Sequence, residues 1–275
     1  MNQVVIVRIY NGLGNQMFQY ALGRHLALLN DAELKLDISA FRNDPLRKYE
    51  LHHLSIAESL VDIDLSANIE EMELTRVVQK DRFFDPAVLL TRGNIYLRGY
   101  WQTEKYFSDI RPILQKEFEL KASPDERNLE LLSAITATDS VALHVRRSDY
   151  VSNPTSTDHH GVLPVQYYQE AIRRISDRVA QPVFFIFSDD PEWCEDNIKP
   201  HAQTFYVDTN DASQGQEDLR LMKQCKHFII ANSSFSWWGA WLSKNPDKIV
   251  IAPQRWFAKP QIDTRDMIPA GWIRI

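Results

Sequence analysis

The segment "SVALHVRRSDY", residues 140–150, carries an apolar run straight into two arginines and an aspartate. Side chains alternate along a strand, so His144 and Arg146 share one face and Arg147 lies on the other. One arginine is then able to face a ligand, while the other stabilises the surrounding structure. A guanidinium fork matches phosphate oxygens and keeps its charge when partly buried, so the pattern favours a phosphate ligand. An ion pair between Arg147 and Asp149 explains the same residues without any ligand.

The charge of the whole chain limits the kind of anion. The 275 residues carry a formal net charge of -6, and the sequence pI is near 5.8. A nucleic-acid-binding protein usually shows a basic excess, so no nucleic-acid partner is expected. A small anion would have to be held by a local cluster of positive groups.

Two turns combine small or hydroxyl residues with the start of an expected helix. In "NGLGN", residues 11–15, the glycines allow a tight turn, but Met17 takes the third glycine position of G-x-G-x-x-G and no G-x-x-x-x-G-K-[ST] phosphate loop occurs. "NSS", residues 232–234, offers hydroxyls and free N–H groups that suit a phosphate. A plain strand-to-helix turn and helix capping are the alternative interpretations.

Carboxylates and aromatic rings mark three further places. Asp189 and Asp190 end a strongly apolar strand, where a carboxylate accepts hydrogen bonds from a ribose or guanine or caps the next helix. Rings next to a carboxylate suit a sugar, and core packing explains them nearly as well; they are Tyr100, Trp101 and Glu104. Three tryptophans of one expected helix are typical of core packing rather than of a sugar platform: Trp237, Trp238 and Trp241.

No metal site is expected. "DID" at Asp62–Asp64 matches the DxD pattern of metal-dependent glycosyltransferases, but it lies in an acidic, weakly structured stretch and is interpreted as chance. The eight histidines include no HExxH or similar spacing.

The elements that position these residues follow an α/β pattern, since short apolar runs alternate with amphipathic stretches. In the first half we predict strands at 3–10, 32–39 and 94–100 and helices at 16–30 and 103–118. In the second half we predict strands at 140–145, 182–188, 204–208, 227–231 and 248–252 with helices at 164–179, 191–198, 215–224 and 233–244. Such alternation predicts a doubly wound parallel sheet, in which ligands bind at the carboxyl ends of the strands.

A polar stretch at 119–128 containing Pro124 is the expected join between two domains, 1–125 and 126–275, with the end of the chain crossing back. The N-terminal apolar run, Val4–Val7, is too short for a signal peptide or a membrane span. A cytoplasmic protein is therefore expected, with peripheral membrane contact left open.

The order of the motifs is more specific than any one of them. "GLGNQMFQYALG", "GYWQTEKYF", "HVRRSDY", "FSDD" and "NSSFSWWGAWL" follow one another as in the α-1,2-fucosyltransferases, which the chain resembles along nearly its whole length. "HVRRSDY" is similar to the H-x-R-R-x-D motif that α-1,6- and protein O-fucosyltransferases partly share. Ser148 stands where glycine is more usual.

The resemblance implies an α/β fold of the GT-B type, with two Rossmann-like domains facing across a cleft, the first on the acceptor side and the second binding the donor. It implies GDP-β-L-fucose as donor substrate, with no cofactor and no metal. The implied reaction is an inverting transfer to the 2-hydroxyl of a galactoside. The implied acceptor is a galactose-terminated oligosaccharide or a lipid-linked glycan, such as an O-antigen repeat unit.

Matching positions imply the roles of the residues. Without a metal ion, protein donors must stabilise the charge that develops on the leaving GDP. The resemblance assigns Arg146 to the β-phosphate and His144 to the nucleoside, with Arg147 and Asp149 as support. A second group matches segments that hold phosphate, nucleotide or guanine or that line the acceptor side: Ser233, Ser234, Phe235, Asp189 or Asp190, Gly14 and Asn15.

The general base stays open between residues of one loop. Inversion places the acceptor hydroxyl opposite GDP, and a base normally takes its proton. Asp158 and His160 lead, since this loop supplies the base in the α-1,6 relatives, while Glu104 and Asn15 are outsiders. A dissociative reaction needs only a weak base, or an oxygen of GDP itself.

Rival functions share parts of this pattern. One is a GDP-sugar transferase with another donor or linkage, and another is a non-catalytic sugar-binding protein that uses Trp101 and the tryptophan-rich helix. A nicotinamide-dependent enzyme is disfavoured because G-x-G-x-x-G is absent.

Overall fold

The computed structural model describes residues 3–56, 59–61, 73–147, 151, 154–211, 213–259 and 261–275. The chain divides into two compact units. Unit 1 holds residues 1–121 and 263–269, and unit 2 holds residues 122–262 and 270–275. Each unit contains its own parallel sheet.

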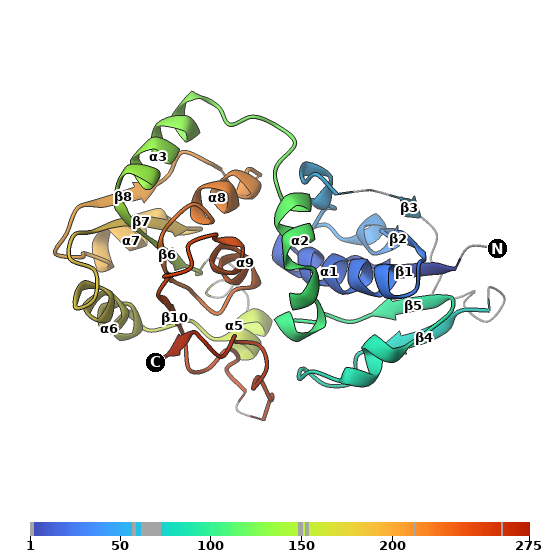
Figure 1. The fold of residues 1–275 in the computed structure, drawn as a ribbon. Helices are drawn as coiled ribbons and strands as arrows, with labels where there is room; N and C mark the ends of the chain where they lie inside the picture. The colour runs from blue at the N-terminus through green and yellow to red at the C-terminus, as the bar shows by residue number, and fades with distance from the viewer. Residues whose placement is uncertain are drawn as a thin grey trace. The chain divides into compact units, whose positions relative to one another are not determined.

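The sheet of unit 1 has the strand order β3-β2-β1-β5-β4, and the strands are parallel throughout. The strands are β1 (Val4–Arg8), β2 (Glu33–Asp37), β3 (Leu60–Val61), β4 (Thr75–Val78) and β5 (Ile95–Arg98). Helix α1 (Leu13–Leu29) follows β1 and packs on the sheet (Figure 1). A Cβ on Gly23 would lie only 2.9 Å from Val7 Cγ1, so a glycine there lets α1 approach the strands closely.

The rest of unit 1 is built from short helical turns. They are η1 (Ser39–Asn43), η2 (Leu51–His53), η3 (Pro86–Leu90), η4 (Glu104–Tyr106), η5 (Ser108–Ile110) and α2 (Arg111–Glu117). The single helix predicted at 103–118 is therefore wrong. Pro112 has no N–H and a φ suited to a first helical turn, so α2 begins at Arg111, while Thr103 caps the separate turn η4.

The sheet of unit 2 has the strand order β11-β10-β9-β6-β7-β8, again parallel. The strands are β6 (Asp139–Val145), β7 (Pro182–Ser188), β8 (Thr204–Val207), β9 (His227–Ile229), β10 (Val250–Ala252) and β11 (Ile273–Arg274). The helices are α3 (Glu126–Ala137), α5 (Pro154–His160), α6 (Val165–Ser176), α7 (Pro191–Asn197), α8 (Gly215–Met222) and α9 (Ser234–Leu242). The predicted parallel α/β sheet is confirmed in this half.

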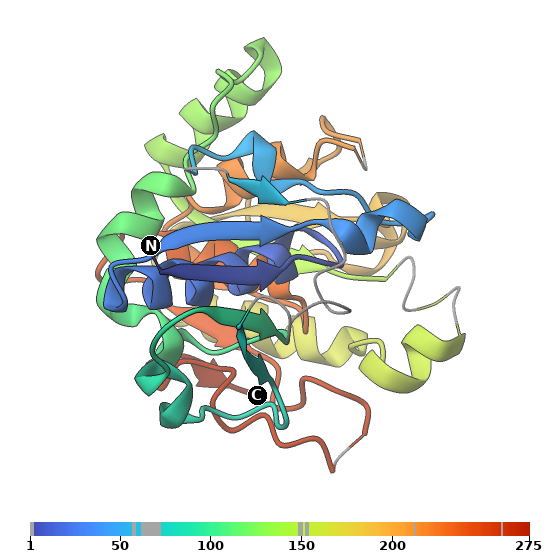
Figure 2. The same ribbon diagram turned by 90° about the vertical axis from the view of Figure 1, so that its right-hand side faces the viewer.

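Helices cover both faces of this sheet (Figures 1 and 2). On one face, α6 and α7 pack on β6 and β7 through a core that includes Tyr168, Ile175 and Cys194. On the other, α8 packs against both α3 and α9, and a Cβ on Gly239 of α9 would lie 2.4 Å from Met222 Sδ. The tryptophans of α9 are buried, with ring centroids 5.0–5.9 Å apart, which confirms their predicted role in the core: Trp237, Trp238 and Trp241.

Helix α3 and strands β3, β4 and β11 are elements that the sequence did not predict. The chain leaves unit 2 after β10 and returns to unit 1, where Asp266 pairs with Lys105 and accepts the N–H of Phe84 at 2.9 Å. Within the described residues, no helix is both long and apolar enough to cross a membrane.

Candidate functional site

The arginine motif lies at the carboxyl edge of the unit 2 sheet, where β6 and β7 end side by side. An Arg146 terminal nitrogen lies 3.1 Å from Asp189 Oδ2, and the Arg146 side chain is 25% exposed. The other oxygen of Asp189 accepts the backbone N–H of Arg147 at 2.8 Å. One carboxylate therefore fixes both the guanidinium and the backbone of the motif, so Arg146 is held in place at the edge where doubly wound sheets bind ligands.

Arg147 has a different environment. Its Nε donates to Asp190 Oδ2 at 3.0 Å, and its guanidinium lies 4.0 Å from the centre of the Trp193 ring. Asp190 also caps α7 by accepting the N–H of Trp193 at 3.3 Å. The structure thus gives Arg147 a carboxylate and a ring face, and its supporting role stays a prediction. Both aspartates face arginines here, which leaves their predicted guanine contact a prediction.

His144 is buried next to a ring that comes from another element. Its ring centroid lies 5.7 Å from that of Phe235, in the first turn of α9. Burial, and then the positive charge of Arg146, lower the pKa of His144 to about 3, so the imidazole is neutral at physiological pH. Its Nδ1 is buried and has no hydrogen-bond partner within the described residues. A neutral imidazole with an unsatisfied nitrogen is suited to bind a polar ligand atom.

The turn between β9 and α9 presents the start of a helix at the same edge. Ser233 is the N-cap, and its Oγ accepts the N–H of Phe235 at 3.3 Å. The predicted cap is therefore Ser233 rather than its neighbours. Ser234, the first residue of α9, is partly exposed, and within the described chain its hydroxyl makes no hydrogen bond. Hydroxyls and N–H groups at a helix start suit an anion.

Asp158 and His160, predicted to lie in a loop, belong to helix α5, and Asn232 ties the end of this helix to the turn. Its buried side-chain amide donates to the carbonyls of His160 at 2.9 Å, Gly161 at 3.3 Å and Trp256 at 3.2 Å. The end of α5 is therefore anchored to the carboxyl edge of β9. The His160 ring lies 5.6 Å from the Phe257 ring and is partly buried, whereas Asp158 is exposed.

Gly14 and Asn15 belong to unit 1, in the first turn of α1. The N–H of Leu13 donates to the Glu50 carboxylate at 3.0 Å, and burial raises the pKa of Glu50. A protein carboxylate thus takes one N–H of this helix start, as in a plain strand-to-helix turn. Gly14 is buried, and Asn15 Oδ1 accepts a hydrogen bond from Gln102 at 2.8 Å.

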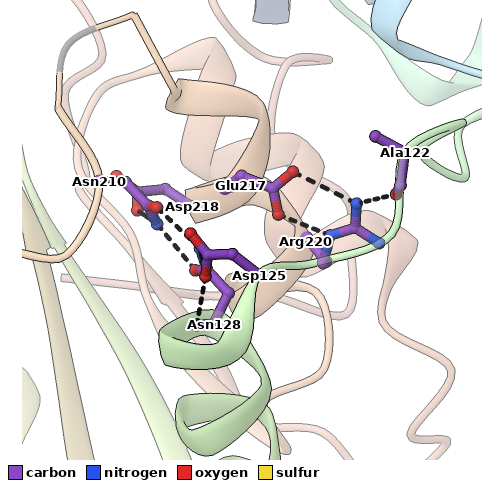
Figure 3. A network of polar contacts seen from close by, with 7 residues as sticks. All are labelled: Ala122, Asp125, Asn128, Asn210, Glu217, Asp218 and Arg220. Carbon is purple, nitrogen blue, oxygen red and sulfur yellow. Dashed lines mark hydrogen bonds and ion pairs between the residues drawn. The ribbon is translucent and has the colours of Figure 1, made fainter.

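A polar network that the sequence did not reveal lies at the start of α8 (Figure 3). Asn210 donates to Asn128 at 3.0 Å and to Asp218 at 2.8 Å. Arg220 pairs with Glu217 and donates to the carbonyl of Ala122. A Cβ on Gly215, the first residue of α8, would lie 4.0 Å from the Phe235 ring, so this helix begins next to the ring that contacts His144. The network joins residues far apart in the chain, so no local sequence pattern predicts these contacts.

Asp218→Asn is expected to remove a pH dependence of stability. Burial, reinforced by Glu217 and opposed by the Asn210 hydrogen bond, raises the pKa of Asp218 from 3.8 to about 7. The folded state thus keeps a proton that the unfolded chain releases above pH 4, and this stabilisation is lost as pH rises through 7. From pH 5 to pH 8 the wild type should lose about 3 kcal/mol relative to the variant, measured by urea unfolding. Parallel pH profiles for the two proteins would contradict this account.

Within the described residues, no three His, Cys, Asp or Glu side chains are placed to hold a metal ion. Asp62–Asp64, with the "DID" pattern, and Asp149 of the arginine motif lie outside the described residues.

The chain is similar in sequence to several glycosyltransferases. The chain is 34% identical over 294 residues to an α-1,2-colitosyltransferase of Escherichia coli, with 99% of each chain covered. It is 32% identical to the O-antigen biosynthesis glycosyltransferase WbnK of Escherichia coli, covering 90% of this chain and 93% of the relative. A galactoside 2-α-L-fucosyltransferase of Bos taurus is 31% identical over 54% of this chain and 42% of its own length.

Solved structures agree in fold. Arabidopsis thaliana FUT1, a mutant in complex with GDP, matches with a TM-score of 0.55 and 10% identity over 98% of this chain and 75% of that one. NodZ α-1,6-fucosyltransferase soaked with GDP-fucose matches with a TM-score of 0.53 and 13% identity over 88% and 93%. The sequence profile of Glycosyl transferase family 11 matches residues 1–275. This match over the whole chain confirms the resemblance seen in the motifs, and the chain belongs to glycosyl transferase family 11.

Proposed function

We propose that the protein transfers L-fucose from GDP-β-L-fucose to the 2-hydroxyl of a galactoside, with inversion at the anomeric carbon. The observation that carries this proposal is the cluster at the carboxyl edge of the unit 2 sheet, where Asp189 holds Arg146 and the His144 ring lies beside Phe235. The family supplies the class of reaction, and the α-1,2 linkage in the names of two relatives supports the position of attack.

In this proposal Arg146 stabilises the leaving diphosphate. Charge builds up on GDP as the bond to the sugar breaks, and a guanidinium that is already oriented needs no reorganisation to meet it. The Ser234 hydroxyl and the start of α9 add donors for the same phosphates. His144, neutral because of its burial, binds the nucleoside as a hydrogen-bonding group rather than as a cation.

The acceptor hydroxyl needs a group that takes its proton on the face opposite GDP. Asp158 and His160 are the proposed candidates, and the anchoring of His160 by Asn232 supports a defined position for the end of α5. Asp158 is exposed, so its carboxylate is accessible to a bound acceptor. The proposed acceptor is a galactose-terminated oligosaccharide or a lipid-linked glycan.

A second donor is favoured by one specific observation, because a relative covering 99% of the chain is a colitosyltransferase. Colitose is fucose without the 3-hydroxyl, so the two donors differ by one polar group. A site that hydrogen-bonds this hydroxyl should reject GDP-colitose strongly, whereas a site lined by apolar groups should accept both. Competition between the two donors at equal concentration, with product analysis by mass, decides between them.

Transfer is expected to be independent of divalent cations. If arginine and helix N–H donors meet the charge on GDP, then 5 to 10 mM EDTA, as a rough working concentration, should leave the rate unchanged within about twofold. The check is the initial rate with and without EDTA, followed by addition of Mg²⁺ or Mn²⁺. Activity that is lost in EDTA and restored by either ion would contradict this expectation and support Asp62–Asp64 as a metal-binding DxD motif.

A further inference from the structure

The carboxyl edge of the unit 1 sheet carries a second polar cluster, built around Tyr100 of the segment "GYWQTEKYF". Arg82 lies 4.5 Å from the centre of the Tyr100 ring, and the Tyr10 ring meets the same ring edge to face at 5.2 Å. Asn11 donates to the Tyr100 hydroxyl at 2.9 Å. Arg82 also donates to Gln102 at 3.1 Å, which joins the rings to the start of α1.

The backbone around these rings is strained and held by side chains. Asn11 and Trp101 have φ values of 65° and 56°, in the left-handed region that a bulky residue such as tryptophan rarely enters. Gln79 Oε1 accepts the N–H groups of both Tyr100 and Trp101, at 2.8 and 3.1 Å. Strained backbone that neighbouring groups hold in place is frequent at binding sites.

A chain of amides fixes which atom Asn15 presents. Arginine only donates hydrogen bonds, so Gln102 must turn its oxygen toward Arg82. The Gln102 nitrogen then donates to Asn15 Oδ1 at 2.8 Å, which leaves Asn15 to present its NH₂ group. Asn15 is partly exposed, and within the described residues this NH₂ group makes no hydrogen bond. Arg82 therefore sets the orientation of the Asn15 amide through Gln102.

We propose that Asn15 binds the acceptor glycoside by donating this NH₂ group to an ether oxygen of the sugar, and that Gln102 and Arg82 are positioning residues for it. This inference rests on the proposed function and specifies its acceptor side. Ring and glycosidic oxygens of a galactoside only accept hydrogen bonds, so they require a donor. Tyr10 and Tyr100, both partly exposed, lie beside Asn11 at the same edge of the sheet. An Asn15 whose oxygen is already engaged serves as a binding group and not as the base.

The decisive variant is Gln102→Glu, which changes no volume. Its carboxylate accepts from Arg82 and presents its second oxygen to Asn15, so the Asn15 amide turns its NH₂ inward and its oxygen toward the ligand. With lactose as the acceptor probe, KM should rise by tenfold or more, on the order expected for replacing a hydrogen bond by an unsatisfied contact. Asn15→Asp should raise KM by a similar factor, because it removes the same donor. Hydrolysis of GDP-fucose without acceptor is recorded for both variants, so that damage to the donor site is told apart from a loss of acceptor binding.

Gln181→Glu is the matched control, since this exposed glutamine at the amino end of β7 adds the same charge at the end of the unit 2 sheet opposite to its arginine motif. It should leave KM for lactose unchanged. An unchanged KM in Gln102→Glu would overturn the inference, as would a wild type that hydrolyses GDP-fucose but neither fucosylates lactose nor binds it by saturation-transfer NMR with GDP present. Failure of GDP binding and of hydrolysis in the wild type would instead overturn the proposed function, together with the inference that rests on it.

Discussion

Arg146→Ala is expected to lower kcat for sugar transfer by about 10²- to 10³-fold, the loss typical of removing one preorganised donor from a developing anion. In the proposed role, the guanidinium that Asp189 holds at the edge of the sheet stabilises the charge developing on GDP, so the loss should appear in kcat. The fold should survive, because Arg146 is partly exposed and the frame contacts are made by Arg147 and Trp193. Initial rates at saturating GDP-fucose, together with a melting curve, measure both quantities.

Two further variants sharpen this result. Arg146→Lys keeps the charge but loses the planar fork, so its kcat should fall between those of the wild type and the alanine variant. Arg173→Ala removes an exposed arginine from α6, paired only on the surface with Glu170 and Asp177, and should behave as the wild type. Near-normal turnover by Arg146→Ala would show that the motif is an ion pair and not a phosphate clamp.

Asp158→Ala and His160→Ala are expected to differ sharply, because the proposal requires a single general base and these two residues are its candidates. Loss of a general base lowers kcat by about 10²- to 10⁴-fold. The other substitution should cost much less, since Asp158 is exposed and the His160 backbone, not its ring, is what Asn232 holds. Measurement of kcat across pH 5 to 9 (a rough working range) adds a test, as the acidic limb of the profile should disappear in the variant that lacks the base.

Hydrolysis without acceptor serves as the control for this pair, because a damaged donor site would reduce hydrolysis as well. If both variants transfer fucose at normal rates, neither residue is the base. An oxygen of GDP would then be the natural proton acceptor in a dissociative reaction.

Much of unit 2 was predictable from the sequence for a physical reason. Strands β6 and β7 are buried along most of their length, so apolar residues dominate them, and the charged residues that follow them mark the carboxyl edge. Parallel pairing of these strands then brings Arg146 and Asp189 together, although 43 positions separate them. Helix α3, Glu126–Ala137, escaped prediction because it buries only Asn128 and Ile135 and follows a stretch typical of a linker.

Long-range polar contacts could not be predicted. The amide chain from Arg82 through Gln102 to Asn15 joins residues up to 87 positions apart, and neither glutamine nor asparagine has a pattern that announces its partner. The same is true of Asp218, whose raised pKa comes from burial that only the packed fold creates. The arrangement of two domains across a cleft stays a prediction from the resemblance, and the boundary near residue 125 stays a prediction from the polar stretch at 119–128.

The most direct test of the proposed function is the rate of GDP release from GDP-fucose, with and without lactose, in buffer containing EDTA. The proposal predicts release that lactose stimulates, with a product fucosylated at the 2-hydroxyl of galactose as read by NMR. Slow release that lactose does not change would keep the donor and redirect the search to other galactosides. No release and no binding of GDP would contradict the account, because the arginines at the edge of the unit 2 sheet would then form structural ion pairs and bind no phosphate.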